Sequence, residues 1–339
     1  MWPFRKQRLS SSWRENRSLG LQGVEVRLAD LINLRYQTGL LGVGAKKRVH
    51  SLLAGGERSP FKGRGIDFEE SRRYQPGDDV RLMDWRVMAR TNEPYLKVFR
   101  EERERPVFMV VDARRAMRFG TKVAFKSVIA AHAAALLGWA SQERGDRVGA
   151  VVFSDVDHVE LRPRGGRIGV LRLLNLLVQT NSAPSQIVQP TGYSPSLFQL
   201  ALNRVIKTAK PGSLIFLLSD FREWDEQAKN SLIRLSSHHE IVALLMYDQL
   251  EQEAPPPGHY PVTDGIQMGI LNTGSAQMVQ SYSEQFWQRY EDVRMMCLTR
   301  GIGFIPLGTH DDIPFQLRRG FQNLGNRRSA AHLGVTGVA

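Results

Sequence analysis

The chain has 339 residues, enough for about two domains, and its 42 % hydrophobic and 24 % charged content is ordinary for a globular protein. Its single cysteine, Cys297, excludes internal disulfides and a thiolate-rich zinc site. Such a low cysteine content is expected of a protein in a reducing compartment. The N-terminus lacks the apolar run of a signal peptide, and the longest apolar stretch, near residues 130–140, is too short to span a bilayer, so we expect a soluble cytoplasmic protein without a membrane span.

The net charge of +12 is unevenly distributed along the chain. Residues 1–60 carry 11 Lys and Arg against 4 Asp and Glu, a net charge of +7. Such a region attracts phosphates, anionic lipid headgroups or acidic protein surfaces, although it is also typical of a solubilising arm without a dedicated partner. Apolar residues at helical spacing between residues 24 and 53 predict one or two amphipathic helices. We therefore expect a basic helical N-terminal region over residues 1–60.

Residues 61–105 hold 11 basic and 10 acidic residues, which are interleaved rather than grouped in blocks. Interleaving favours a folded network of ion pairs over a solvated tail, and arginine, the main basic residue here, binds carboxylates through a planar fork. The turn dipeptide Pro76-Gly77 and the alternation over residues 95–99 predict short strands and turns. We expect a small strand-rich module in which Trp85 is either an anchor buried against the sheet or, if exposed, a recognition hot spot.

From Pro106 onward the sequence alternates between predicted strands and predicted helices. Apolar runs typical of strands buried on both faces occur at residues 107–111, 148–153, 214–218, 241–247 and 304–306. Helices are predicted at about residues 123–139, 168–178, 194–208, 225–236 and 283–299. This alternation indicates an α/β fold with a doubly wound, mainly parallel sheet.

The predicted organisation has four parts. The basic N-terminal region (1–60) precedes the strand-rich module (61–105), the α/β domain (106–322) and a disordered tail (323–339), which is small and polar in composition. Within the α/β domain, Asp112 and Asp220 each follow a central strand. Ligands of open α/β sheets bind beyond the carboxyl ends of the strands, so we expect the two aspartates to face each other across that edge.

The module carries a long motif that resembles a known family. The run Phe68-Glu-Glu-x-Arg-x-Tyr-Gln-Pro-Gly-Asp-Asp-Val-Arg-x-x-Asp-Trp-Arg, followed by Ala89-Arg-Thr and Val98-Phe-Arg-Glu-Glu, resembles the signature of the domain of unknown function 58 family. The resemblance continues through Leu217-Leu-Ser-Asp-Phe and Gly301-Ile-Gly-Phe-Ile-Pro-Leu-Gly-Thr, and so covers roughly residues 60–320. It implies a von Willebrand factor A-like domain and a MoxR-type AAA+ ATPase as partner, but no known reaction.

The domain that the resemblance implies binds a divalent cation through Asp-x-Ser-x-Ser after its first strand, a Thr from a later loop and an Asp after its fourth strand. This chain has Arg114 and Ala116 at the two serine positions, and neither supplies the oxygen that a hard cation needs. We predict that this metal-ion-dependent adhesion site is degenerate and that Arg114 or Arg115 pairs with Asp112 and Asp220. The alternatives are a weak residual metal site and two unrelated aspartates. The loop oxygen would come from Thr191, Ser194 or Ser196.

Four other features favour structural roles. Gly39 and Gly44 are spaced as in a phosphate-binding loop, but the lysine is displaced by one position and no strand precedes them. His238 and His239 lack the helical spacing that puts two metal ligands on one face, and His132, in an alanine-rich segment, is predicted to be packed. Acidic residues that could in principle bind nuclease metals, but that nearby arginines are expected to pair, are Asp67, Glu69, Glu70, Asp78, Asp79 and Asp84.

The sequence carries no convincing nucleophile–base pair, metal cluster or phosphate loop. We therefore predict a non-enzymatic protein-binding adaptor without a cofactor, working with the AAA+ ATPase in assembly or maturation of a client protein. The residues expected on its binding surface are Glu69, Glu70, Arg73, Tyr74, Asp78, Asp79, Arg81, Asp84, Trp85 and Arg86. The alternative is a nucleic-acid-binding protein that uses the basic N-terminal region, and a third hypothesis is a metal-dependent hydrolase on the acidic residues of the module.

Overall fold

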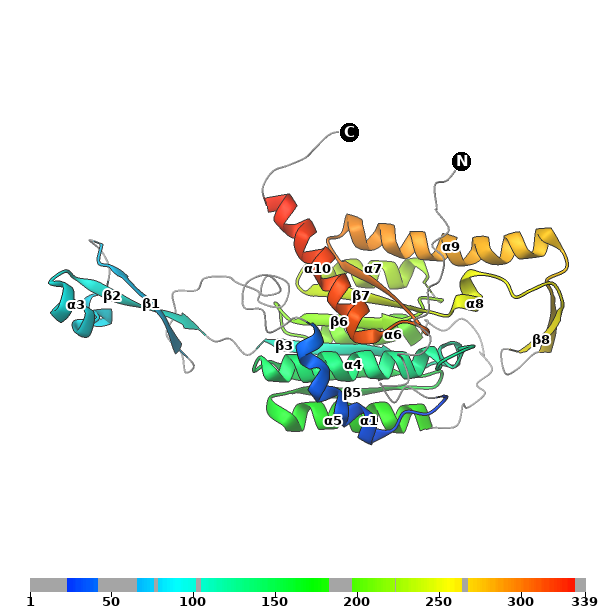
Figure 1. The fold of residues 1–339 in the computed structure, drawn as a ribbon, viewed down its shortest axis with the longest axis horizontal. Helices are drawn as coiled ribbons and strands as arrows, with labels where there is room; N and C mark the ends of the chain where they lie inside the picture. The colour runs from blue at the N-terminus through cyan, green and yellow to red at the C-terminus, as the bar shows by residue number, and fades with distance from the viewer. Residues whose placement is uncertain are drawn as a thin grey trace. The chain divides into compact units, whose positions relative to one another are not determined.

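The computed structural model describes residues 23–41, 66–75, 79–101, 105–182, 197–222, 224–263 and 268–332 (Figure 1). They fall into two compact units. The first, here called the sheet unit, takes in the described residues of Met1–Ala54 and Arg105–Ala339. The second, here called the small unit, takes in those of Gly55–Glu104.

A six-stranded sheet with the order β10-β7-β6-β3-β4-β5 forms the centre of the sheet unit. Its strands are β3 (Pro106–Asp112), β4 (Arg147–Phe153), β5 (His158–Arg164), β6 (Leu214–Ser219), β7 (Glu240–Tyr247) and β10 (Gly303–Gly308). Every neighbouring pair is parallel except β4–β5, which is antiparallel. The apolar runs of the sequence lie in β3, β4, β6, β7 and β10, so the prediction of an α/β fold with a mainly parallel sheet is confirmed.

Helices cover both faces of this sheet (Figure 1). One face packs against α4 (Lys126–Glu143), α5 (Gly166–Ser182) and α10 (Ile313–His332), and the other against α6 (Leu197–Thr208), α7 (Glu226–Ser236) and α9 (Ala276–Thr299). Almost all of α4 is buried, as expected for a helix that is apolar around its whole circumference. The shorter elements are η4 (Arg115–Met117), α8 (Gln249–Gln252) and a hairpin of β8 (His259–Thr263) with β9 (Met268–Asn272).

The segment α1 (Leu28–Asn33) and η2 (Leu34–Leu41) belongs to the sheet unit rather than to a separate N-terminal region. Leu31 and Leu41 are fully buried in the core that contains α4, and Trp139 Nε1 of α4 donates a hydrogen bond of 2.9 Å to the Leu31 carbonyl oxygen. The expected boundary at residue 60 is therefore wrong for residues 23–41. The boundary fails because α4 has a further apolar face, and α1 and η2 pack on that face and bury it.

The prediction of a disordered tail from residue 323 is wrong for the residues that belong to helix α10. The helix runs as far as His332, so residues 323–332 are helical rather than disordered. Its first turns bury Ile313, Leu317 and Phe321, and the Phe321 ring packs edge-on against Phe216 of β6 at a centroid distance of 6.2 Å. A helix that is anchored in this way can extend past its buried turns, because each further residue adds one hydrogen bond for one residue fixed.

The small unit is a two-stranded antiparallel sheet with a helical connection. Strand β1 (Ile66–Arg73) pairs with β2 (Tyr95–Glu101), and η3 (Val80–Leu82) and α3 (Trp85–Thr91) lie between them in sequence. No helix in the described part of the chain is long and apolar enough to cross a bilayer.

Candidate functional site

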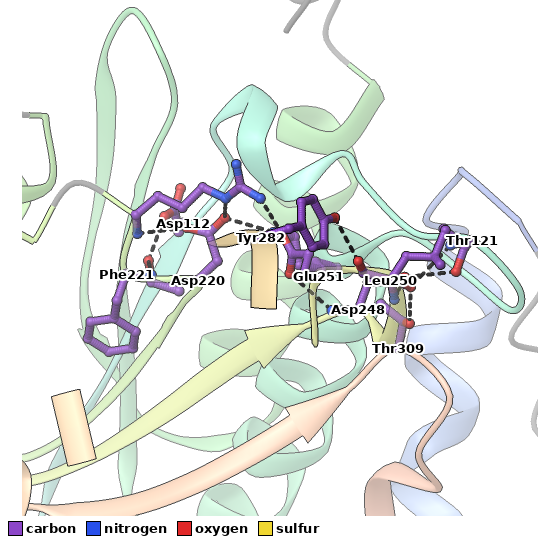
Figure 2. A network of polar contacts seen from close by, with 12 residues as sticks. Asp112, Thr121, Asp220, Phe221, Asp248, Leu250, Glu251, Tyr282 and Thr309 are labelled. Atoms are coloured by element: carbon purple, nitrogen blue, oxygen red, sulfur yellow. Dashed lines mark hydrogen bonds and ion pairs between the residues drawn. The ribbon is translucent and has the colours of Figure 1, made fainter. Parts of the chain in front are cut away.

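Polar side chains converge where three neighbouring strands end (Figure 2). Asp112 is the last residue of β3, Asp220 follows β6, and Asp248 follows β7. These strands are adjacent in the sheet and parallel, so their carboxyl ends share one edge. All three aspartates are buried. We call this cluster the strand-end edge.

Arg114 neutralises Asp112. Its Nε and Nη2 donate hydrogen bonds of 3.0 and 2.7 Å to the two carboxylate oxygens of Asp112, the bidentate geometry that arginine favours. Ser219 Oγ donates a further bond of 2.7 Å to Asp112 Oδ2. The guanidinium is itself buried and lies over the rings of Phe153 and Phe198, at 5.4 and 5.9 Å from their centroids. Asp112 is therefore held by an internal cation.

Asp220 has a different partner from the one expected. Lys126 Nζ, which is completely buried, lies 2.8 Å from Asp220 Oδ2 and 2.8 Å from Glu251 Oε1. Arg222 approaches the same two carboxylates from the rim, with its Nε 3.3 Å from Asp220 Oδ2. The pairing of Asp220 with Arg114 or Arg115 is thus wrong. Arg115 instead donates its backbone N–H to Asp155 Oδ2 at 2.8 Å.

The surroundings of Asp220 and Arg222 favour the charged form of both side chains. Burial alone would raise the pKa of Asp220, but the Lys126 ammonium, with Arg222 and Arg114, holds that pKa below its usual range. Burial alone would lower the pKa of Arg222, but the carboxylates of Glu251 and Asp220 raise it above its ordinary value. For Arg289, burial dominates and lowers the pKa despite the nearby Glu251.

Asp248 organises the third strand end. Thr121 donates to it from both its backbone N–H (3.1 Å) and its hydroxyl (2.7 Å), and the Thr309 hydroxyl also donates to it. Burial alone would raise the pKa of Asp248, but these hydrogen bonds and that from the Leu250 N–H lower it. Asp248 and Glu251 also form a capping box around α8, in which the Asp248 N–H donates to Glu251 Oε2 at 3.1 Å. Glu251 therefore connects the hydrogen bonds around Asp248 to the ion pair with Lys126.

Two further features complete the strand-end edge. Tyr282 of α9 donates its hydroxyl to the Leu250 carbonyl oxygen at 2.6 Å, and burial raises the Tyr282 pKa. Phe221 has a φ of 53°, which is uncommon for a residue with a bulky side chain. Its N–H donates to Ser219 Oγ at 3.0 Å, and its ring packs edge-on against Phe198. Strained backbone of this kind clusters at functional sites.

The donor set of the strand-end edge suits fixed ion pairs better than a metal ion. A divalent cation would have to displace the guanidinium of Arg114 or the ammonium of Lys126 from the carboxylates that they hold. No group of three metal-ligating side chains suited to an ion occurs within the described ranges. The candidate loop oxygens of Thr191, Ser194 and Ser196 lie outside the described residues.

In the small unit, one candidate binding residue is buried in a structural role and its neighbour in sequence is exposed. Asp84 is buried and caps α3: its Oδ1 accepts from the backbone N–H groups of Arg86 (3.2 Å) and Val87 (3.3 Å), and its Oδ2 accepts from Ser71 Oγ (2.8 Å). Trp85, the next residue, is 64 % exposed. Asp84 therefore has a structural role, and the tryptophan beside it is available for contact.

The other candidates of this unit lie around the hairpin. Asp79 caps η3 by accepting from the Arg81 N–H at 3.0 Å. Arg73 forms an exposed ion pair with Glu93 at 2.8 Å, and its pKa is raised by a hydrogen bond with Tyr95 and by the Glu93 charge. Asp67, Glu69 and Glu70 lie on β1. The backbone N–H of Tyr74 donates to the Pro94 carbonyl oxygen. Asp78 lies outside the described residues.

Comparison with known proteins decides the family. The chain matches the family described as "Protein of unknown function DUF58" over residues 70–294. This chain belongs to that family. The matched range contains the small unit from Glu70 onward and most of the strand-end edge, whereas α1, η2 and α10 lie outside it.

Two mycobacterial proteins are similar to this DUF58 protein. It is 27 % identical over 227 residues to "Uncharacterized protein Mb1516" of Mycobacterium bovis and to "Uncharacterized protein Rv1480" of Mycobacterium tuberculosis, covering 66 % of this chain and 68 % of each relative. Similar solved structures are the conserved hypothetical protein BatB from Bacteroides thetaiotaomicron (12 % identity, TM-score 0.39) and an aerotolerance-related membrane protein from Bacteroides fragilis (15 %, 0.37). Each covers 66 % of this chain and 99 % of the solved one.

Three histidines that the sequence singles out, and the glycine of its glycine-rich segment that the structure describes, lie in helices or in the connection between a helix and a strand. His132 is buried in α4 with Nδ1 2.8 Å from the Val128 carbonyl oxygen, and burial lowers its pKa. His238 and His239 connect α7 to β7, where burial lowers the pKa of His239. Gly39 lies in η2, and Gly44 lies outside the described residues.

Replacing Asp84 by alanine is expected to loosen the small unit. The change removes the acceptor for two N–H groups of α3 and for Ser71, and the loss of a helix cap costs about 1–2 kcal/mol. Faster hydrogen exchange of the α3 amides, measured by mass spectrometry, would report it. Asp84→Asn keeps a capping oxygen and is the matched control. Unchanged exchange in the alanine variant would contradict a structural role for Asp84.

Proposed function

We propose that this DUF58 protein is a non-enzymatic adaptor that docks a MoxR-type AAA+ ATPase during assembly or maturation of a client protein. The observation that carries this proposal is the internal neutralisation of the strand-end edge. Arg114 occupies both oxygens of Asp112, and Lys126 bridges Asp220 and Glu251. Carboxylates held in this way offer neither an open coordination position nor a poised proton acceptor. Being buried, they instead fix the strand ends rigidly beneath the surface.

The sheet unit fits a von Willebrand factor A-like domain with a degenerate cation site. Asp112 ends β3 and Asp220 follows β6, the two strand ends from which such a domain supplies its aspartates. Arg114 stands at the position of the first motif serine and provides, as part of the chain, a positive charge beside Asp112. On this proposal the fixed cations preserve the shape of the edge and remove its dependence on a bound ion.

The small unit supplies the second argument for a docking role. Trp85 and Val80 are both exposed, and Arg81 and Arg86 are their sequence neighbours. Tryptophan and arginine are enriched among the residues that dominate binding energy, because a large rigid ring fills a partner's pocket while the guanidinium forms directed hydrogen bonds. We propose Trp85 as the anchor of this surface.

Trp85→Ala is expected to abolish capture of the ATPase without affecting the fold. Loss of an anchor residue costs about 2 kcal/mol or more, which is roughly a thirtyfold loss of affinity. The measurement is a tagged pull-down from native cells at low and moderate salt with nuclease treatment, read by mass spectrometry. Phe315→Ala, at an aromatic residue of α10 that is 53 % exposed, is the matched control. Equal recovery of an AAA+ ATPase with both variants, or recovery of none with the unmodified protein, would sink the proposal.

The nucleic-acid hypothesis makes a separate prediction for the same experiment, which is recovery only of material that is lost with nuclease or salt. Deleting residues 1–60 is not a clean test of it, because residues 23–41 contribute buried leucines to the core of the sheet unit. A variant that lacks residues 1–22 leaves every described contact in place and serves instead.

A further inference from the structure

An open pocket lined mainly by arginines lies at the outer edge of the sheet, along β5. Its volume is about 660 Å³. The residues that line it come from β4, β5 and α5: Arg147, Glu160, Arg162, Pro163, Arg164 and Arg172. We call it the arginine pocket. The residues of the strand-end edge are not among those that line it.

The pocket has more positive charge than its own carboxylate can balance. Glu160 is already paired with Arg204 of α6. Arg162, Arg164 and Arg172 form no ion pair with any residue in the described ranges. Other arginines of the sheet unit do have carboxylate partners, as Arg105 has in Glu240 at 2.8 Å. These three arginines, without a carboxylate partner among the described residues, attract an anionic ligand.

The local backbone decides how such a ligand can bind. The β4–β5 register shifts between Val148 and Ala150, and Pro163 packs so close to Gly149 that a Cβ added there would lie 2.9 Å from the proline Cγ. Proline lacks a backbone N–H, and an irregular edge strand resists pairing with a further strand. A ligand is therefore recognised by the arginine side chains and not by strand addition.

The lining of the pocket also favours one class of ligand. Guanidinium forks fit carboxylates and phosphates equally well. Single-stranded nucleic acid, however, is bound through aromatic rings on which its bases stack, and the lining contains none. We propose that the arginine pocket binds a glutamate- or aspartate-rich segment of a partner protein. This role is independent of the proposed ATPase docking and stands if that docking fails.

Binding of a fluorescein-labelled oligoglutamate peptide to the full chain, followed by fluorescence anisotropy, tests the proposal. The double variant Arg162→Glu/Arg164→Glu is expected to bind the peptide at least about tenfold more weakly, because two charge-assisted contacts become repulsive. The matched control is Arg318→Glu/Arg319→Glu, which changes the net charge equally at two exposed arginines of α10. The control should retain peptide affinity within about twofold. Unchanged melting temperatures verify that both variants fold.

Three results would overturn the proposal. Equal losses in the two double variants would mean that the peptide responds only to net charge. Unchanged affinity in Arg162→Glu/Arg164→Glu would mean that it binds elsewhere. Pocket-dependent binding of a labelled oligonucleotide, with no measurable binding of the peptide, would assign the pocket to nucleic acid instead.

Discussion

Replacing Lys126 by methionine is expected to destabilise the sheet unit by about 3–5 kcal/mol, the usual cost of removing one partner from a buried ion pair. The variant keeps the length of the side chain but leaves Asp220 and Glu251 without the ammonium that lies 2.8 Å from each of them. Both carboxylates are buried, and the partly exposed Arg222 is the cation that stays with them. Urea denaturation followed by circular dichroism measures the change in the free energy of unfolding.

The matched control for this prediction is Lys122→Met, because Lys122 lies just before α4 and is exposed. It should change the free energy of unfolding by no more than about 0.5 kcal/mol. Equal effects of the two substitutions would contradict the structural role of the buried ammonium.

The pH dependence of the unmodified protein follows from the same ion pair. The folded-state pKa of Asp220 lies below its unfolded value, so its contribution to stability is present above the unfolded pKa of about 3.9 and is lost as the pH falls through the folded pKa. The difference in stability between the unmodified protein and Lys126→Met should therefore narrow in acid.

Leu31→Ala is expected to cost about 2–5 kcal/mol, the range for truncating a fully buried leucine. Leu31 is completely buried against α4, and the truncation leaves a cavity next to the carbonyl group that Trp139 binds. The measurement is the midpoint and slope of urea denaturation. Leu40→Ala is the control, because Leu40 lies on the adjoining η2 with 54 % of its surface exposed. Equal stabilities of the two variants would mean that residues 23–41 are not part of the core.

The sheet could be predicted from the sequence because its strands are buried on both faces. Such strands are continuous apolar runs, as in Val107-Phe-Met-Val-Val, and their alternation with helices indicates parallel order. The two aspartates could be placed for the same reason, since each ends a run. Asp248 follows a third apolar run, and Glu251 three residues later gives the spacing of a capping box. The position of Asp248 at the strand ends is therefore also predictable from the sequence.

The partner of Asp220 could not be predicted in this way. Lys126 lies 94 residues before Asp220 and 125 residues before Glu251 in the sequence, and a lysine at a helix start is ordinarily solvated. Only the packing of α4 beneath the strand ends brings the three groups together. Similarly, the exposure of Trp85 depends on the packing of the small unit, whereas the capping role of Asp84 follows from an aspartate directly before a helix.

The early segment of α1 and η2 and the late helix α10 pack together over α4, and this arrangement constrains the order of folding during synthesis. Leu31 and Leu41 leave the ribosome before α4 exists to receive them. Phe321, which belongs to the same core, follows far later in the sequence. This core therefore closes only after Phe321 has been translated, and a nascent chain that lacks it presents exposed leucines that a chaperone would recognise.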